Sequence, residues 1–159
     1  MTKHIILLCA LLIFVGCGRQ NMPDGMLALH PCQIIVTRDG QPFAMAEVKL
    51  YPVESQKKDW STTGLTETNG VIDLRTNANY SGVPAGKYKI IVVKEDIENV
   101  DNNFYYRVNT VDPKFGTMEL TPLEIEIKSG KNKQTVEVGP EIKTRIGGKL
   151  RKSNGGTDK

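Results

Sequence analysis

The stretch KYKIIVVK, residues 87–94, has the strongest β propensity in the chain and decides its fold class. Its second half consists mainly of β-branched residues, which favour the extended backbone of a strand. The turn-forming tripeptide Pro-Ala-Gly at positions 84–86 precedes it directly. A short apolar run bounded by turn residues is typical of a buried strand, and we expect this one at the centre of a sheet.

The sequence before this stretch alternates between apolar and polar residues, which predicts further strands. In residues 46–51, Ala46, Val48 and Leu50 occupy alternate positions, as in a strand with one buried face. Residues 33–38 (QIIVTR) are rich in β-branched side chains and end at an Asp-Gly dipeptide, which favours a tight hairpin turn.

Two more pairs of short strands follow the same pattern. Residues 62–66 and 71–74 flank Glu-Thr-Asn-Gly at 67–70, a second hairpin signal, and residues 123–127 and 136–138 predict a third hairpin. Apolar residues do not recur at helical spacing over three turns, so helices should be minor. Several short strands at about ten-residue spacing predict an all-β fold, an antiparallel β-sandwich of about seven strands.

These strands and turns carry a family resemblance between residues 34 and 93. The segments are Asp-Gly-Gln-Pro at 39–42, Ala-Glu-Val-Lys-Leu at 46–50, Thr-Glu-Thr-Asn-Gly-Val-Ile-Asp-Leu at 66–74 and Val-Pro-Ala-Gly-Lys-Tyr-Lys-Ile at 83–90. The set resembles the carboxypeptidase regulatory-like, transthyretin-like domain, in which Phe is usual where Ile72 stands. Residues 111–115, 121–123 and 130–132 are similar to small planctomycete-type bacterial lipoproteins. The resemblance implies a transthyretin-like or Ig-like sandwich.

The N-terminal residues have the order of an export signal. Lys3 supplies a positive charge, and residues 5–15 are an unbroken run of eleven apolar residues. As a helix this run would span about 16 Å, well short of the roughly 30 Å hydrocarbon core of a membrane. It therefore predicts a signal peptide of residues 1–16 rather than a membrane span.

Cys17 directly follows the apolar run, in the sequence Phe-Val-Gly-Cys at 14–17. This tetrapeptide resembles the bacterial lipobox, although Leu is usual where Phe14 stands. The resemblance implies cleavage before Cys17 and its modification by fatty acyl chains, palmitate among them. At about 0.8 kcal/mol per buried CH₂, two such chains give stable membrane anchoring. The alternative is a conventionally secreted or uncleaved chain in which Cys17 is incidental.

The mature chain divides into a tether, a body and a tail. Residues 17–31 contain Gly, Asn, Pro and Asp without periodicity and predict a lipidated tether. Residues 32–140 form the predicted sandwich, and the Gly-rich, basic residues 141–159 predict a disordered tail. The anchor implies a bacterial cell envelope, and Gly18 after the lipidated cysteine favours the outer membrane of a Gram-negative cell. The formal charge of +3 is too small to suggest a nucleic-acid partner.

The mature chain offers little for catalysis or metal binding. Its one histidine, His30, stands two residues from Cys32 across a proline, a poor arrangement for a nucleophile pair. Zinc needs three or four ligands, and these two are the candidates. Transthyretin-like hydroxyisourate hydrolases carry active-site histidines and a Tyr-Arg-Gly-Ser C-terminus, which this chain lacks. We expect no enzyme activity, no catalytic or metal-binding residue and no cofactor.

The longest predicted irregular stretch, residues 95–120, is the best place for binding, because long loops on a sandwich often carry it. It begins with an acidic run at 95–101, which we interpret as a solvated loop rather than a calcium site. It also contains three consecutive aromatic residues. The candidate ligand-contact residues are Trp60, Phe104, Tyr105 and Tyr106.

These features favour a non-catalytic, membrane-anchored envelope lipoprotein that acts as a structural or protein-interaction module. Its partners would be the membrane, through the lipid anchor, and an envelope protein or polysaccharide. The alternative is a surface receptor for a small ligand or carbohydrate. A receptor needs its aromatic residues gathered in an exposed concave site. Clustering of Trp60 with residues 104–106 would therefore distinguish the two functions.

Overall fold

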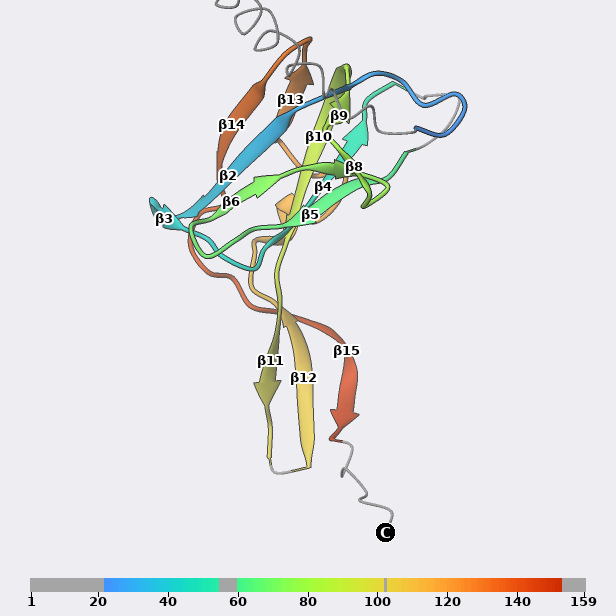
Figure 1. The fold of residues 1–159 in the computed structure, drawn as a ribbon. Helices are drawn as coiled ribbons and strands as arrows, with labels where there is room; N and C mark the ends of the chain where they lie inside the picture. The colour runs from blue at the N-terminus through green and yellow to red at the C-terminus, as the bar shows by residue number, and fades with distance from the viewer. Residues whose placement is uncertain (1–21, 55–59, 102, 153–159) are drawn as a thin grey trace, which may run out of the picture.

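A computed structural model describes residues 22–54, 60–101 and 103–152, which form an all-β fold, as predicted (Figure 1). The described elements are β1 (Leu29–His30), β2 (Cys32–Arg38), β3 (Gln41–Pro42), β4 (Glu47–Pro52), β5 (Thr62–Leu65), β6 (Val71–Asp73), β7 (Arg75–Thr76), β8 (Tyr80–Ser81), β9 (Val83–Pro84), β10 (Gly86–Val93), β11 (Glu95–Asn99), β12 (Phe104–Asn109), the 3₁₀ segment η2 (Pro113–Phe115), β13 (Glu124–Ile127), β14 (Asn132–Glu137) and β15 (Thr144–Arg151).

The larger sheet has the strand order β13-β10-β4-β5-β7-β8 and consists of antiparallel pairs. β10 lies inside this sheet, between β4 and β13, which confirms the central position predicted for residues 87–94. Its alternate residues Tyr88, Ile90 and Val92 are buried in the hydrophobic core. The apolar run therefore lies in the middle of the fold because the face that carries these three side chains is buried in the core.

The smaller sheet is built around β2 and closes the other side of the core. β2 pairs with β14 along one edge and with β3 and β6 along the other. Its residues Ile34 and Val36 are fully buried in the same cluster as Val48 of the larger sheet and Val136 of β14. Two sheets that share one core make the predicted β-sandwich. The pair of β2 with β14 is parallel, whereas the sequence predicted antiparallel pairs.

The predicted hairpins are correct at their turns and wrong in several strand partners. Asp39 and Gly40 adopt positive φ angles of 50° and 72° and turn the chain from β2 into the short β3. The next strand, β4, joins the larger sheet instead of pairing with β2. β13 and β14 likewise separate, to β10 and β2. Apolar alternation indicates which face of a strand is buried, but a connection between sheets preserves that alternation equally well.

A third sheet, which we call the arm, has the order β11-β12-β15 and projects from one end of the sandwich (Figure 1). Two predictions are wrong here. Residues 95–99 and 104–109 form the two strands of a hairpin rather than part of an irregular loop, and residues 144–151 form a strand rather than a disordered tail. The outer strands β11 and β15 carry three charged residues each, so a search for apolar alternation does not detect them.

The arm and the described end of the tether lie at opposite ends of the molecule (Figure 1). β1, which forms within the predicted tether, pairs with β9 just before β10 begins at Gly86. The chain then runs through β10 and β11 to Asn99, near the tip of the arm. At about 3.3 Å per residue, this run is roughly 40 Å long.

Candidate functional site

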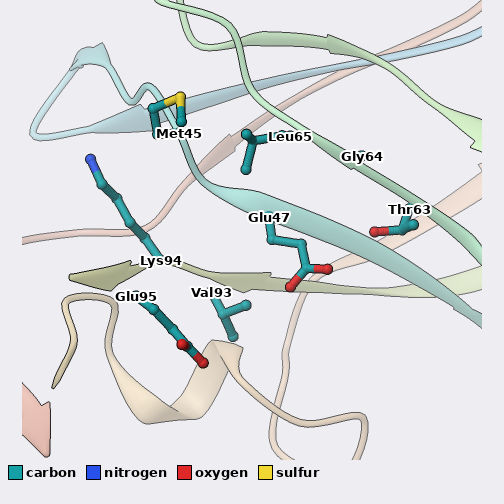
Figure 2. Close-up of a pocket in the computed structure, with 8 residues that line it drawn as sticks. All are labelled: Met45, Glu47, Thr63, Gly64, Leu65, Val93, Lys94 and Glu95. Atoms are coloured by element: carbon teal, nitrogen blue, oxygen red, sulfur yellow. The ribbon is translucent and has the colours of Figure 1, made fainter. Parts of the chain in front are cut away.

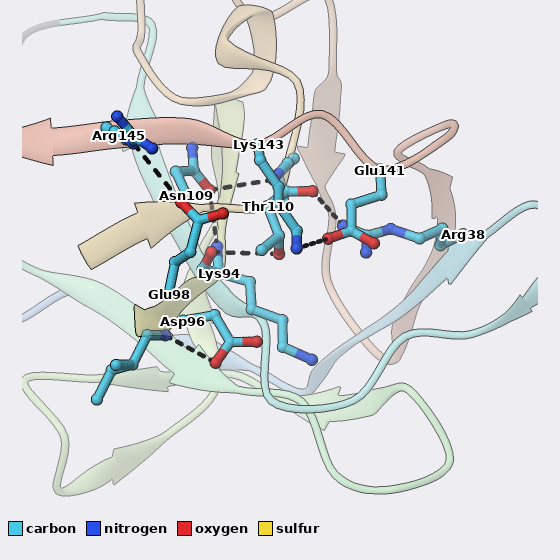
Figure 3. Close-up of polar contacts among 11 residues, drawn as sticks. Arg38, Lys94, Asp96, Glu98, Asn109, Thr110, Glu141, Lys143 and Arg145 are labelled. Atoms are coloured by element: carbon cyan, nitrogen blue, oxygen red, sulfur yellow. Dashed lines mark hydrogen bonds and ion pairs between the residues drawn. The ribbon is translucent and has the colours of Figure 1, made fainter. Parts of the chain in front are cut away.

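A polar junction at Lys94 and Thr110 joins the arm to the sandwich (Figure 3). Lys94 stands between β10 and β11, and its carbonyl accepts a 2.9 Å hydrogen bond from the Thr110 N–H. Asn109 Oδ1 accepts from the N–H groups of Lys94 and Val111, at 3.3 and 3.2 Å. The Arg38 guanidinium of β2 donates to the Thr110 carbonyl. These bonds satisfy the backbone where the arm leaves the sandwich, so the arm starts from a defined geometry.

The buried Phe43 ring supports the same junction from the side of the smaller sheet. The guanidinium carbon of Arg38 lies 3.8 Å from the ring centroid, and Lys94 Nζ lies 4.8 Å from it. Lys94 Nζ also donates a 3.0 Å hydrogen bond to the Ala44 carbonyl. Cation–π contacts contribute about 0.5–1 kcal/mol at exposed sites and more when desolvated. The junction is therefore held by packing as well as by hydrogen bonds.

Two adjoining pockets lie beside the junction. The first, of about 530 Å³, is lined by β4, β5 and the crossing from β10 to β11 (Figure 2). The second, of about 390 Å³, lies between β4, the η2 region and the base of β15. Glu47, Val93 and Glu95 line both pockets. Met45 and Leu65 line the first pocket, and both are exposed apolar side chains.

The carboxylates shared by these pockets are already paired with cations. Glu47 lies 3.0 Å from Lys49 Nζ, and Glu95 forms an ion pair with Arg107. General acid–base catalysis depends on titratable groups free to exchange protons with a bound substrate. In this structure, both carboxylates are engaged in ion pairs.

The two faces of the arm differ in chemistry. The register of β11, β12 and β15 places alternate residues of each strand on a common side. One side, which we call the apolar face, carries Ile97, Tyr105, Ile146 and Leu150 around the ion pair of Glu95 with Arg107. Ile97 is 60% exposed and Leu150 is 37% exposed. These apolar side chains are not part of the core of the sandwich.

The opposite side of the arm, which we call the charged face, carries Phe104 and Tyr106. Lys149 Nζ lies 4.2 Å from the centroid of the Phe104 ring, and the Arg145 guanidinium lies 4.3 Å from that of Tyr106. Arg145 is also 3.6 Å from the carboxylate of Glu98. Each of these two rings therefore has one face covered by a cation of β15.

The structure does not bring the four candidate aromatic residues together. Trp60 is half-buried and precedes β5, whose first residue, Thr62, pairs with Leu50 near the end of β4 farthest from the arm. Tyr105 lies on the apolar face of the arm, and its two neighbours in sequence lie on the charged face. These residues do not form the common aromatic platform that a receptor was expected to have.

Sequence reasoning missed the apolar face, although weak signals for it exist. Ile97 stands between Asp96 and Glu98, so an alternation is present but looks like an acidic loop. Ile146 and Leu150 are separated by a bulge, because the pairing register shifts opposite Tyr106. A strict alternation of period two cannot detect a strand interrupted in this way.

The acidic run at 95–101 is part of this hairpin, and its interpretation as a solvated loop is wrong for residues 95–99. Asp101 closes the turn, since its Oδ1 accepts hydrogen bonds from the N–H groups of Asn103 and Phe104, at 2.7 and 2.9 Å. These bonds, that of Asn103 foremost, lower the pKa of Asp101, and nearby Lys149 adds to the effect. Within residues 22–54, 60–101 and 103–152, no three His, Cys, Asp or Glu side chains gather as a metal site would require.

Cys32 and His30 occupy different surroundings. Cys32 begins β2 with its side chain in the core, and burial, followed by the charge of Asp73, raises the pKa of its thiol to about 11. Such a thiol is protonated at neutral pH and is a poor nucleophile. His30 lies in β1, where it pairs with Val83 of β9.

The predicted lipidation site, Cys17, and the predicted signal peptide lie outside the described residues. In the part of the chain that is described, no helix has the length and apolar content needed to cross a bilayer. Comparisons with family models, curated proteins and solved structures give no significant match. The likeness to carboxypeptidase regulatory-like domains therefore rests on the sequence motifs.

Proposed function

We propose that this protein is a non-catalytic bacterial envelope lipoprotein, anchored through Cys17, that presents the arm to a protein partner. The observation that carries the proposal is the exposed apolar face of the arm, with Ile97 and Leu150 beside half-buried Tyr105 and Ile146. These side chains lie outside the hydrophobic core of the sandwich, and a partner that covers them would explain their placement.

The position of the arm supports this role. The chain enters the sandwich at β1, which pairs with β9, and the arm projects from the other end (Figure 1). A lipid at Cys17 would place the membrane on the tether side. The arm would then point away from the bilayer, where a partner can reach both of its faces.

The size of the surface favours a weak or transient contact. Three strands about 4.8 Å apart, with about five residues of 3.3 Å each, cover roughly 250 Å². Stable interfaces bury about 800 Å² on each partner. The adjoining pockets, with Met45 and Leu65, extend the apolar face toward that size. Tyr105 and Arg107 are of the residue types that contribute most to such interfaces.

The alternative, a receptor for a small ligand or carbohydrate, has less support. Trp60 lies at the far end of the sandwich from the aromatic residues of β12. The rings of Phe104 and Tyr106 each have one face covered by Lys149 or Arg145, which competes with stacking of a sugar. We therefore favour the protein-interaction module.

Chemical crosslinking in isolated native envelopes tests the proposal. The full-length protein should give discrete crosslinked species that contain an envelope protein, and Ile97→Asn should lose most of them. Asparagine removes the most exposed apolar side chain of the face, on the outer strand β11, without adding a charge. The matched control is Leu120→Asn, because Leu120 is also 60% exposed but precedes β13, outside the arm. Equal crosslinking of both variants would contradict a role for the apolar face.

A further inference from the structure

The C-terminal strand of the arm, β15, buries no large side chain between Thr144 and Leu150. Of residues 144–150, Ile146 is half-buried and the others are exposed. β15 forms its ladder with β12, the middle strand of the arm. A strand held by its ladder and by surface contacts can separate from its partner at a lower cost than a strand of the core.

The charges of β15 complement those of the hairpin with which it pairs. Arg145 of β15 lies 3.6 Å from the Glu98 carboxylate, and Lys149 lies 3.6 Å from the Asp101 carboxylate. The same two cations lie over the rings of Tyr106 and Phe104. The acidic groups and aromatic rings of the hairpin of β11 and β12 therefore complement the basic side chains of β15.

The outer edges of the arm are poorly suited to the addition of a fourth strand. The Lys94 carbonyl points toward β12, where it accepts a hydrogen bond from the Thr110 N–H. Backbone groups of successive residues in a strand point alternately to its two sides, so the Ile97 N–H points away from β12, toward the open edge. Asp96 Oδ1 accepts that N–H at 2.8 Å and so occupies the centre of the β11 edge. The β15 edge is interrupted at Gly147, which has a φ of 70°. Such features protect edge strands from further pairing.

The connection between β14 and β15 leaves room for rearrangement. Gly139 has a φ of 66°, and residues 140–143 are exposed. The ion pair recorded within this segment, between Glu141 and Lys143 at 3.8 Å, is internal to it. A change in its direction therefore leaves the sandwich core intact.

We propose that β15 exchanges between two copies of this chain, so that the hairpin of one copy binds the β15 strand of the other. Each copy then makes the same ladder and the same ion pairs as the single chain, which is why strand exchange gives dimers at low energetic cost. The inference rests on the proposed function in one respect. Anchoring to a membrane concentrates the copies and so favours exchange.

Disulfide trapping between two full-length variants in detergent tests the exchange. One variant carries Tyr105→Cys and the other Leu150→Cys, because these two residues are paired in the β12–β15 ladder. Each variant alone lacks the second cysteine of the pair and so cannot form this disulfide. Native Cys32 is buried and should not compete. Exchange predicts a disulfide-linked heterodimer after mixing. The background is given by Tyr51→Cys mixed with Leu150→Cys, since Tyr51 is an exposed tyrosine of β4.

A charge reversal separates exchange from simple packing of two apolar faces. Glu98→Lys is added to the Tyr105→Cys copy and Arg145→Glu to the Leu150→Cys copy. Each chain then repels its own β15, whereas both exchanged interfaces are attractive. The heterodimer yield should rise about threefold or more, in line with surface ion pairs. Packing through the apolar face would not respond in this way, because residues 98 and 145 lie on the charged face.

Two outcomes would overturn the inference: a heterodimer yield no higher than the Tyr51→Cys background, or a yield that the charge reversal does not raise. Neither outcome bears on the proposed function, which depends on envelope crosslinks through Ile97. Loss of those crosslinks as a result of Ile97→Asn, with no strand exchange, would support the module and reject the dimer.

Discussion

Glu137 of β14 accepts hydrogen bonds from the turn between β2 and β3 and so stabilises that turn. Its carboxylate accepts hydrogen bonds from the N–H groups of Asp39 at 2.9 Å, Gly40 at 3.2 Å and Gly139 at 2.9 Å. Desolvation alone would raise the pKa of this carboxyl, but the hydrogen bonds from Thr37 and these amides outweigh it and lower the pKa below its ordinary value of 4.5. One side chain thereby ties together two segments that are distant in sequence.

Glu137→Gln should lower the free energy of unfolding by about 1 kcal/mol at pH 7, because hydrogen bonds to a carboxylate are stronger than those to an amide. A carboxyl whose pKa is lower in the folded state stabilises fully above its unfolded pKa. This contribution is lost as the pH falls through the folded pKa. Urea unfolding at pH 7 and pH 3 should therefore show a difference at pH 7 that shrinks at pH 3.

The control for this measurement is Glu126→Gln, since Glu126 is an exposed carboxylate on β13 that pairs with Lys128 at 3.4 Å. It should change stability little at either pH, as is usual for surface ion pairs. A difference between wild type and Glu137→Gln that stays the same from pH 7 to pH 3 would contradict the role given to the carboxylate.

At the scale of elements, two turns that look alike in sequence differ in their surroundings. Gly40 and Gly70 both have positive φ, of 72° and 74°. A Cβ at Gly40 would meet no atom within 4 Å, whereas one at Gly70 would lie 2.5 Å from the Val36 carbonyl oxygen and 2.9 Å from the Phe43 nitrogen. Gly70 is therefore required by close backbone approach as well as by its φ.

Gly70→Ala should lower the free energy of unfolding by about 3 kcal/mol, the sum of left-handed backbone strain and the clash with backbone. Gly40→Ala should cost about 1 kcal/mol, because it suffers the strain alone. Chemical denaturation of the two variants side by side provides the measurement. Equal losses would mean that the turn at Gly70 relaxes to admit the methyl group.

The junction between the arm and the sandwich should control how readily the hairpin of β11 and β12 opens. Arg38→Met removes the hydrogen bond to the Thr110 carbonyl and the cation over Phe43. Amide hydrogen exchange in β11 and β12 should accelerate about tenfold, as expected for the loss of a bond worth about 1.5 kcal/mol, while exchange in β10 stays unchanged. Arg75→Met, at an exposed arginine of β7, is the control. Uniform acceleration over the whole chain would contradict a local role.

The alternation of apolar residues was sufficient to predict most strands of the sandwich and the central place of β10. It was not sufficient to predict their partners. Ile125 and Val136 both point into one core, yet β13 and β14 belong to different sheets. The neighbours of a strand depend on which sheet each connection leads to, and this is determined by contacts between residues far apart in the sequence.

The strands of the arm were not predicted from the sequence, for a different reason. Its strands are stabilised by ion pairs such as those of Glu98 with Arg145 and Asp101 with Lys149, between residues about fifty positions apart. Each acidic or basic segment alone resembles a solvated loop or tail. The candidate site therefore became visible when the fold brought the two segments together.

At the scale of the whole molecule, anchoring and partner binding are assigned to different parts of the chain. The N-terminal motif at Cys17 predicts a membrane anchor, and the arm at the other end of the sandwich carries the proposed contact surface. Arg145 and Lys149 of β15 lie in the arm, far from the tether, and pair with Glu98 of β11 and Asp101 of the turn after it.

Anchoring through Cys17 is tested by the intact mass and the membrane partitioning of the protein made in a bacterial host, with wild type compared with Cys17→Ser. Wild type should lose residues 1–16, gain the mass of fatty acyl chains and fractionate with membranes. Cys17→Ser should lack the acyl mass and should not fractionate with membranes. If both proteins lack acyl mass and fractionate alike, the lipoprotein claim is wrong.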